Sequence, residues 1–372
     1  MKSILLVVIV LVISFAAYAQ TETPISQAEY VKMLYKLDSD PASKDSLIQE
    51  IRTRGIGFKL SSGIRSLTTS KSKNDQELKR ALEEANRRRE NPEAAKRPNV
   101  VEASALLEKT RENTLSAVDE MPDFVVKQLV RRGIAYAGTN NFRSIDHLIV
   151  GVSYLAKGEE EYKVLSVNGI RQPDPKYTRS YSNLQGTSST GEFVTVLATI
   201  FKPESDTKFE VLDTDSIGGK RAVIFDFSIQ REKARETITS QQLVSRTTTA
   251  GMRGKIWIDR DKARVLRIES TATDIPIDFP VTSAKRIIDY GWVKINDEAY
   301  LLPSDSEVRL TSRQDGKEYE TKNQILFKDY QKYGSEVIIL DDDEVVDEPK
   351  KSDENLNDKL LPPPPPPIDQ SE

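Results

Sequence analysis

Cysteine is missing from the 372 residues, and histidine occurs once, at His147. Such a chain forms no disulfide framework and no zinc or iron–sulfur site built from several cysteine or histidine ligands. The sequence also lacks a G-x-S-x-G turn, a glycine-rich phosphate loop and an H-E-x-x-H metal motif. We therefore predict a non-enzymatic protein with no catalytic residues, no metal and no cofactor.

His147 itself has a strand-like setting. It shares one face of a predicted strand with Ile145 and Ile149. That setting favours a packed or edge residue over a general base. Carboxylates are plentiful but form no recognisable pair, so an enzyme that uses scattered carboxylates is only a third hypothesis.

Long apolar runs are missing beyond the N-terminus. The run from Ile4 to Phe15 is apolar apart from one serine, and Ala17-Tyr18-Ala19 follows it as a signal-peptidase pattern. The run is too short for a bilayer core of about 30 Å, which needs about 20 residues. We predict that residues 1–19 are a signal peptide cut between Ala19 and Gln20. The protein is then periplasmic or secreted, with no permanent membrane anchor.

Acidic charge is concentrated in the last part of the sequence. Residues 341–372 hold 11 acids and 3 bases, whereas the rest of the chain is nearly neutral. A nearly neutral body offers no basic face for a nucleic acid, so we predict no nucleic-acid partner. The run Asp341–Glu344 lacks the spaced ligands and the turn glycine of a calcium loop. We interpret it as part of a solvated acidic tail.

The tail continues into a run of six prolines, Pro362–Pro367. Segments of this composition bury too little apolar surface to offset the entropy of ordering. We predict a disordered acidic, proline-rich tail over residues 336–372. A polyproline II rod favours a stiff spacer, and docking on an envelope protein is the alternative.

The mature chain begins with helical spacing. Ser26 and Glu29 have the spacing of a capping box in front of an apolar stripe. Gly55 is placed to end a second helix. These signals predict a small helical module over residues 20–70.

Charged residues then dominate, and we predict a charged helix or linker over residues 71–100. Its run Arg87-Arg88-Arg89 lies beside several glutamates, which favours an exposed helix end over a contact with an anionic surface. Another amphipathic helix is expected from Val101 to about Val118.

Beyond the helices, apolar residues recur at every second position. Val223, Phe225 and Phe227 alternate with polar residues, and turn signals such as Asp315-Gly316 separate consecutive runs. The fold class is therefore α+β, with a long antiparallel sheet over residues 101–335 that must curl into a half-barrel. About ten strands are expected near residues 124–136, 143–155, 160–167, 207–215, 220–229, 243–259, 263–274, 283–295, 299–313 and 317–330.

One segment inside the strand region is helical. Ser189 and Glu192 have capping-box spacing, and Pro203 ends the pattern. We expect this helix to lie on the concave face of the sheet, together with the 101–118 helix. Its apolar stripe then lines or covers an apolar pocket, and ordinary core packing without a cavity is the alternative. The stripe consists of Phe193, Val196, Leu197, Ile200 and Phe201.

A hairpin from Gly254 to Glu269 carries a family resemblance. Its first strand has a glycine, Trp257 between two isoleucines, and Asp259; after a charged turn the second strand reads Val-Leu-Arg-Ile-Glu. This hairpin resembles one common in the superfamily of LolA-like outer-membrane lipoprotein carriers and related periplasmic sensors. Further stretches resemble uncharacterised exported bacterial proteins: Phe124, Gly191–Phe193, Ile200–Phe201 and Arg54–Phe58.

The resemblance implies a curved antiparallel sheet whose concave side is closed by helices and holds acyl chains. Trp257 joins the helix stripe as a pocket candidate. The leading hypothesis is an exported, non-enzymatic envelope protein that binds or carries an apolar ligand, a lipid or an acylated protein. The alternative is a structural or interaction scaffold with a filled core, which contacts an envelope protein through Pro362–Pro367.

Overall fold

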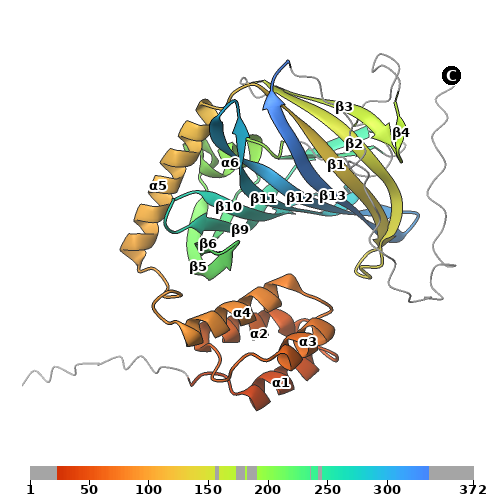
Figure 1. Cartoon of the computed structure of the whole chain (residues 1–372). Coiled ribbons are helices and arrows are strands. Elements are labelled where there is room, and N and C mark those ends of the chain that lie inside the picture. The colour runs from red at the N-terminus through yellow and green to blue at the C-terminus, as the bar shows by residue number, and fades with distance from the viewer. Residues whose placement is uncertain are drawn as a thin grey trace, which may run out of the picture. The chain divides into compact units, whose positions relative to one another are not determined.

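The computed structural model describes residues 23–155, 159–172, 181, 191–234, 236–241 and 245–334 (Figure 1). The expected signal peptide, the acidic run and the proline run lie outside the described residues. The chain divides into two compact units, Met1–Lys96 and Arg97–Glu372. Within the described residues, no helix has the length and apolar character needed to cross a membrane.

The first unit is helical. Its described part contains α1 (Gln27–Lys36), α2 (Ser43–Arg54), α3 (Ser62–Lys71) and α4 (Gln76–Glu90). The capping box predicted before α1 is confirmed: the Glu29 N–H donates to Ser26 Oγ at 3.2 Å, and the Ser26 N–H donates to the Glu29 carboxylate at 3.4 Å. Gly55 ends α2 at φ 68°, in the left-handed region that favours glycine.

Helix α4 is part of the core of this unit. Its residues Leu78 and Leu82 are buried against apolar residues of the other three helices. Residues 76–90, within the segment expected to be a charged helix or linker, form helix α4, and the first compact unit extends to Lys96. Arg87, in the last turn of α4, donates to the buried Glu84 carboxylate at 2.7 Å. These arginines belong to ion pairs within the helix end.

The second unit begins with α5 (Val100–Asp119) and continues into antiparallel strands. In the described part, eleven strands form one sheet in the order β4-β3-β2-β1-β13-β12-β11-β10-β9-β6-β5, and β7 pairs with β8. The strands are β1 (Phe124–Tyr136), β2 (Arg143–Leu155), β3 (Glu159–Val167), β4 (Ile170–Arg171), β5 (Lys208–Ile217), β6 (Lys220–Ile229), β7 (Thr237–Gln241), β8 (Ser245–Thr249), β9 (Gly251–Asp259), β10 (Val265–Thr273), β11 (Val281–Ile295), β12 (Glu298–Gln314) and β13 (Lys317–Lys332).

The predicted α+β class and long curved antiparallel sheet are confirmed, with two corrections to the strands. The single strand expected over 243–259 is two strands, because β8 pairs with β7 whereas β9 pairs with β6 and β10. The chain thus changes sheets at Ala250. Strands β4 and β7 were not predicted; they are short, and a short strand shows little periodicity.

The sheet curves strongly and remains open, because β4 and β5 are its two edges (Figure 1). Gly254 marks a close approach of β9 and β10: a Cβ at this position would lie 1.9 Å from the carbonyl oxygen of Glu269. The register also shifts between Val265 and Arg267, and such bulges bend a strand and increase its twist. A residue with no side chain therefore permits the tight packing of these two backbones.

The sheet has an inner face, defined here as the face against which α6 packs, and an outer face. Helix α6 (Thr195–Phe201) and α5 lie over inner-face residues of β6, β9, β10 and β11. The other half of the inner face, on β1, β2, β3, β12 and β13, forms a second buried cluster. The alternation predicted for Val223, Phe225 and Phe227 places all three in the first cluster.

Helix α6 begins later than the sequence predicted. Its N-cap is Val194, whose side chain makes no capping hydrogen bond, and Ser189 lies outside the described residues. The capping box expected at Ser189 and Glu192 therefore does not start this helix. Gly191 has φ 82°, and residues 192–194 form a turn that directs Phe193 into the second cluster. Tertiary packing of Phe193 outweighs the local capping signal.

We expect Gly254→Ala to lower the free energy of unfolding by about 2–3 kcal/mol, because the β10 backbone must move to admit a methyl group. Urea unfolding followed by circular dichroism measures the change. Gly291→Ala is the matched control, since its added Cβ would meet Ser304 at 3.5 Å, an ordinary contact. Equal losses in the two variants would contradict the close approach at Gly254.

Candidate functional site on the inner face of the sheet

Four of the five predicted stripe residues lie together between α6 and the sheet. Val196, Leu197, Ile200 and Phe201 are buried in one cluster with strand residues of β6, β9, β10 and β11. Helix α5 covers this layer with half-buried leucines such as Leu107. The α6 residues thus occupy the part of the inner face where an apolar ligand was expected to bind.

Phe193, the fifth stripe residue, lies in the second cluster. Its ring packs edge-on against Phe124 at 5.3 Å and Phe327 at 5.6 Å between centroids. Tyr154 and Tyr330 complete the aromatic group around it. Phe193 therefore connects the turn before α6 to β1 and β13 through aromatic contacts. Such contacts favour defined ring orientations and stabilise the packing beyond the burial of apolar area.

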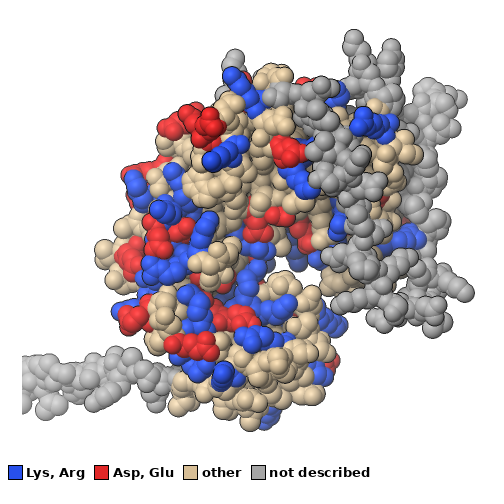
Figure 2. All heavy atoms as spheres, in the orientation of Figure 1, with Lys and Arg blue, Asp and Glu red and all other residues tan. Residues whose placement is uncertain are grey.

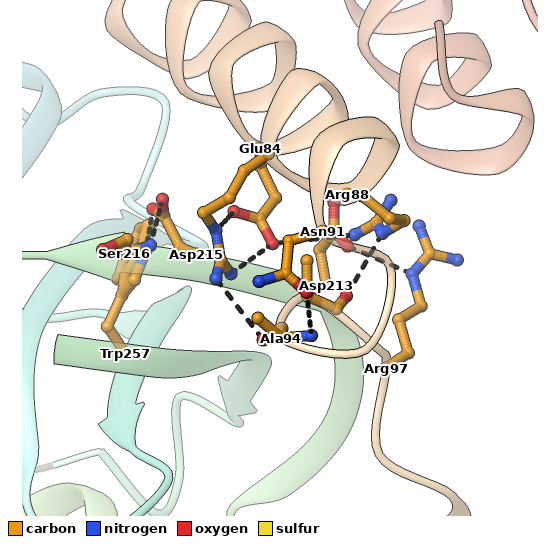
Figure 3. Close-up of polar contacts among 11 residues, drawn as sticks. Glu84, Arg88, Asn91, Ala94, Arg97, Asp213, Asp215, Ser216 and Trp257 are labelled. Atoms are coloured by element: carbon orange, nitrogen blue, oxygen red, sulfur yellow. Dashed lines mark hydrogen bonds and ion pairs between the residues drawn. The ribbon is translucent and has the colours of Figure 1, made fainter. Parts of the chain in front are cut away.

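Trp257 lies apart from the other five candidates. It belongs to an outer-face cluster with Ile224 and Leu266. Its Nε1–H donates to Asp215 Oδ2 at 2.8 Å, and Asp215 also accepts from the Ser216 N–H at 2.7 Å (Figure 3). The structure therefore does not bring Trp257 together with the α6 stripe, because neighbouring strand residues point to opposite faces.

A band of polar side chains crosses the inner face beside the apolar clusters. In this band Arg132 of β1 lies between Asp146 of β2 and Asn323 of β13, and Arg286 of β11 lies opposite Ser270 of β10. Arg132 is only 3% exposed. Its Nε donates to Asp146 Oδ1 at 2.6 Å, and its Nη2 donates to the second carboxylate oxygen.

Arg286 is the second guanidinium of this band. It forms an ion pair with Glu236 at 3.1 Å. Burial opposes its charge, whereas the carboxylates of Glu236 and Glu192 favour that charge, so that the pKa of Arg286 is raised on balance. Arg132 and Arg286 thus each form an ion pair with a carboxylate.

Glu160 of β3 lies next to this band. Its carboxylate accepts hydrogen bonds from the Tyr162 hydroxyl and from the Gly191 N–H, the latter at 3.0 Å. Burial raises the pKa of Glu160 above its ordinary value, and the charge of Glu192 adds to this rise, while the hydrogen bonds act against it. Three carboxylates, those of Glu160, Glu192 and Glu236, therefore interact with one guanidinium, Arg286.

Several polar atoms on this face are buried without a hydrogen-bond partner in the described structure. Leaving such a group unpaired costs about 1–3 kcal/mol, so an unpaired group calls for a bound water or ligand. These atoms belong to side chains from β1, β3, β11 and β12. They are Gln128 Nε2 and Oε1, Arg132 Nη1, Glu160 Oε1, Arg286 Nε, Tyr290 Oη and Ser306 Oγ.

The polar band was not predicted from the sequence. Gln128 and Arg132 interrupt the apolar inward positions of β1, and that interruption is the one local signal. The described residues contain no group of three or more acidic or histidine side chains positioned to hold a metal ion. His147 lies opposite Arg131 on the outer face, and its backbone N–H donates to Asn168 Oδ1 at 2.9 Å. It is thus separated by the sheet from the carboxylates of the inner face.

Several solved structures are similar to this chain at low sequence identity. A LolA superfamily protein from Nitrosomonas europaea is 11% identical over 62% of this chain and 93% of that chain, with a TM-score of 0.29. A DUF1329 family protein from Desulfovibrio piger is 10% identical over 62% and 95%, with a TM-score of 0.29. A chain of the Pseudomonas aeruginosa MucA/MucB complex is 9% identical over 59% and 94%, with a TM-score of 0.17. No protein-family model and no curated protein matches the chain.

We expect Glu160→Gln to remove one source of pH dependence. Because the folded-state pKa of Glu160 is raised, its stabilising contribution is present below the unfolded pKa and is lost as the pH rises through the folded pKa. The glutamine resembles the protonated form, so the variant gains stability relative to the wild type as the pH rises towards neutral. Urea unfolding across mildly acidic and neutral pH measures the difference. Glu161→Gln, at an exposed neighbouring position, is the control and shows no such trend.

Proposed function

We propose that the protein is an exported, non-enzymatic binding or carrier protein of the cell envelope. Its ligand is apolar or carries acyl chains, as in a lipid or a lipid-modified protein, and binds on the inner face of the sheet. The residues we assign to this site are Phe193, Val196, Leu197, Ile200 and Phe201.

Helix α6 is the observation on which the proposal rests. It has seven residues and no side-chain cap at its N-terminus. So short a helix is not stable by itself, and its buried apolar contacts must hold it on the sheet. An acyl chain that buries the same surface, at about 25 cal/mol per Å², replaces those contacts without loss of hydrophobic stabilisation. The helix is therefore suited to move aside for such a ligand.

The loss of Trp257 from the candidate site also follows from this geometry. An acyl chain beneath α6 contacts inner-face residues such as Phe225 and Ile256, which lie in the α6 cluster. Trp257 follows Ile256 in β9 and points to the other face. Its role is to pack the outer layer, where its indole N–H is bonded to Asp215.

The alternative function is an envelope scaffold with a filled core. The observation that favours it is the burial of the α6 stripe, whose residues are at most 8% exposed. The partner contact suggested for Pro362–Pro367 lies outside the described residues. Lysine, arginine, aspartate and glutamate are intermixed on the side of the molecule visible in Figure 2. That pattern favours a lipid or protein partner over a nucleic acid.

We expect the protein to retain one apolar molecule after incubation with envelope lipids, because the ligand replaces the contacts of α6. Native mass spectrometry measures the adduct, and hydrogen exchange of residues 195–201 should become faster when it is bound. Leu197→Asp and the milder Leu107→Asn should both lower retention of the apolar ligand at least about tenfold, since each places a polar group against the acyl chain of that ligand.

Ile277→Ser is the control for that experiment. Ile277 is 88% exposed, so its replacement removes an exposed apolar side chain and leaves the inner face unchanged. Retention should stay at the wild-type level in this variant. A protein that never acquires an apolar adduct would contradict the carrier function and favour the scaffold.

Tryptophan quenching tests the placement of the ligand. The chain has two tryptophans, so Trp292→Phe leaves Trp257 as the single reporter on the outer face. A lipid brominated along its acyl chain should not quench Trp257, because bromine quenches only at contact. A second protein with Phe193→Trp, in which both native tryptophans are phenylalanine, should be quenched. Quenching of Trp257 alone would place the ligand on the wrong face for our proposal.

A further inference from the structure

We propose that the inner face also contains a polar subsite that binds the ester carbonyl oxygens of an uncharged glycerol ester of fatty acids. This inference rests on the proposed function, because it names the class of ligand that the apolar surface takes. The subsite consists of side chains of Gln128, Arg132, Arg286, Tyr290 and Ser306.

The buried polar atoms without partners carry this inference. Gln128 is 0% exposed, Ser306 is 5% exposed and Tyr290 is 6% exposed, yet their polar side-chain atoms have no hydrogen-bond partner in the described structure. Strand register places these residues on the inner face: Gln128 is opposite Phe327, and Ser306 is opposite Ile288. Native proteins rarely bury such groups unpaired, so a ligand or ordered water is expected to complete their hydrogen bonds.

Hydrogen-bond donors are in excess among the unpaired atoms. Arg132 Nη1, Arg286 Nε and Gln128 Nε2 only donate, and the hydroxyls of Tyr290 and Ser306 donate or accept. Within these five side chains the one unpaired atom that only accepts is Oε1 of Gln128, and the neighbouring Glu160 adds its Oε1. A group rich in acceptors, such as a pair of ester carbonyls, therefore complements the subsite better than a hydroxyl-rich group does.

The charges around the subsite favour an uncharged ligand. Arg132 is neutralised by Asp146, and Arg286 is paired with Glu236. The carboxylate of Glu192 is fully buried nearby and interacts with Arg286. A free fatty acid would bring a further negative charge into this environment, where buried charges need a partner. An ester keeps the carbonyl acceptors and carries no charge.

The subsite borders the apolar surface, as an acyl ester requires. Phe327 is opposite Gln128 in the sheet, and its ring packs against Phe193 at 5.6 Å between centroids. Ser306 likewise lies between Ile288 and Ile325. An ester carbonyl bound by these polar groups therefore leaves its acyl chain next to apolar side chains.

The test compares two probes with the same chains. Dioctanoylglycerol has two ester carbonyls, whereas dioctylglycerol has ether oxygens and no carbonyl. Isothermal titration with the full protein should give about tenfold tighter binding of the ester than of the ether, since the ester carbonyls hydrogen-bond to the buried donors. Octanoate, which carries a charge, should bind more weakly than either glycerol probe.

Gln128→Leu and Ser306→Ala are the matched variants. Each should reduce the preference for the ester to within about twofold, while the affinity for the ether stays unchanged. Both variants should unfold at the same or a higher urea concentration than the wild type, because removing an unpaired polar group removes its cost. An unchanged preference in both variants would overturn the assignment of these residues.

Two other outcomes separate the inference from the proposed function. If the wild type binds the ester and the ether equally well, the proposed apolar site is supported and the carbonyl subsite is wrong. Ordered water alone then completes the hydrogen bonds of the buried polar atoms. If the wild type binds neither probe, the proposed function fails with it.

Discussion

One face of the long antiparallel sheet must be covered, and the architecture of the second unit depends on this constraint. The inner face carries two large apolar clusters, and α5, α6 and the turn at Phe193 shield them from water. The close approach at Gly254 accompanies the curvature of the sheet around that cover. Burial of apolar surface is the main favourable term in folding. The sheet therefore curves around the helices that cover it, and the helices are held by the apolar surface they bury.

The two helices that cover the inner face differ in how firmly they are held. Helix α5 has 20 residues and an Asn99 cap, whose side chain accepts the Glu102 N–H, whereas α6 is short and uncapped. A weakly held helix over an apolar face with unpaired polar atoms is the arrangement that an amphipathic ligand would complete. The proposed binding of an apolar ligand on the inner face rests on this arrangement.

Local signals predicted much of the fold. The capping box at Ser26 and Glu29 and the two-residue alternation of Val223 to Phe227 depend on short-range geometry, and both are confirmed. The start of α6 was wrong because Phe193 gains more from aromatic partners on β1 and β13 than the backbone gains from a cap. Trp257 did not join the stripe because neighbouring residues of a strand point to opposite faces, and Ile256 and Ile258 on either side of it point to the inner face.

By itself, the sequence determined the fold class, the positions of most strands, the stripe of α6 and the lack of cysteine chemistry, because each depends on composition or on spacing along one segment. Only the tertiary structure decided which residues share the inner face. Gln128 of β1 lies far in the sequence from Arg286 of β11 and Ser306 of β12, and strand pairing through β13 brings the three residues to one surface. Their burial without partners is a property of that surface, since no single segment determines what packs against it.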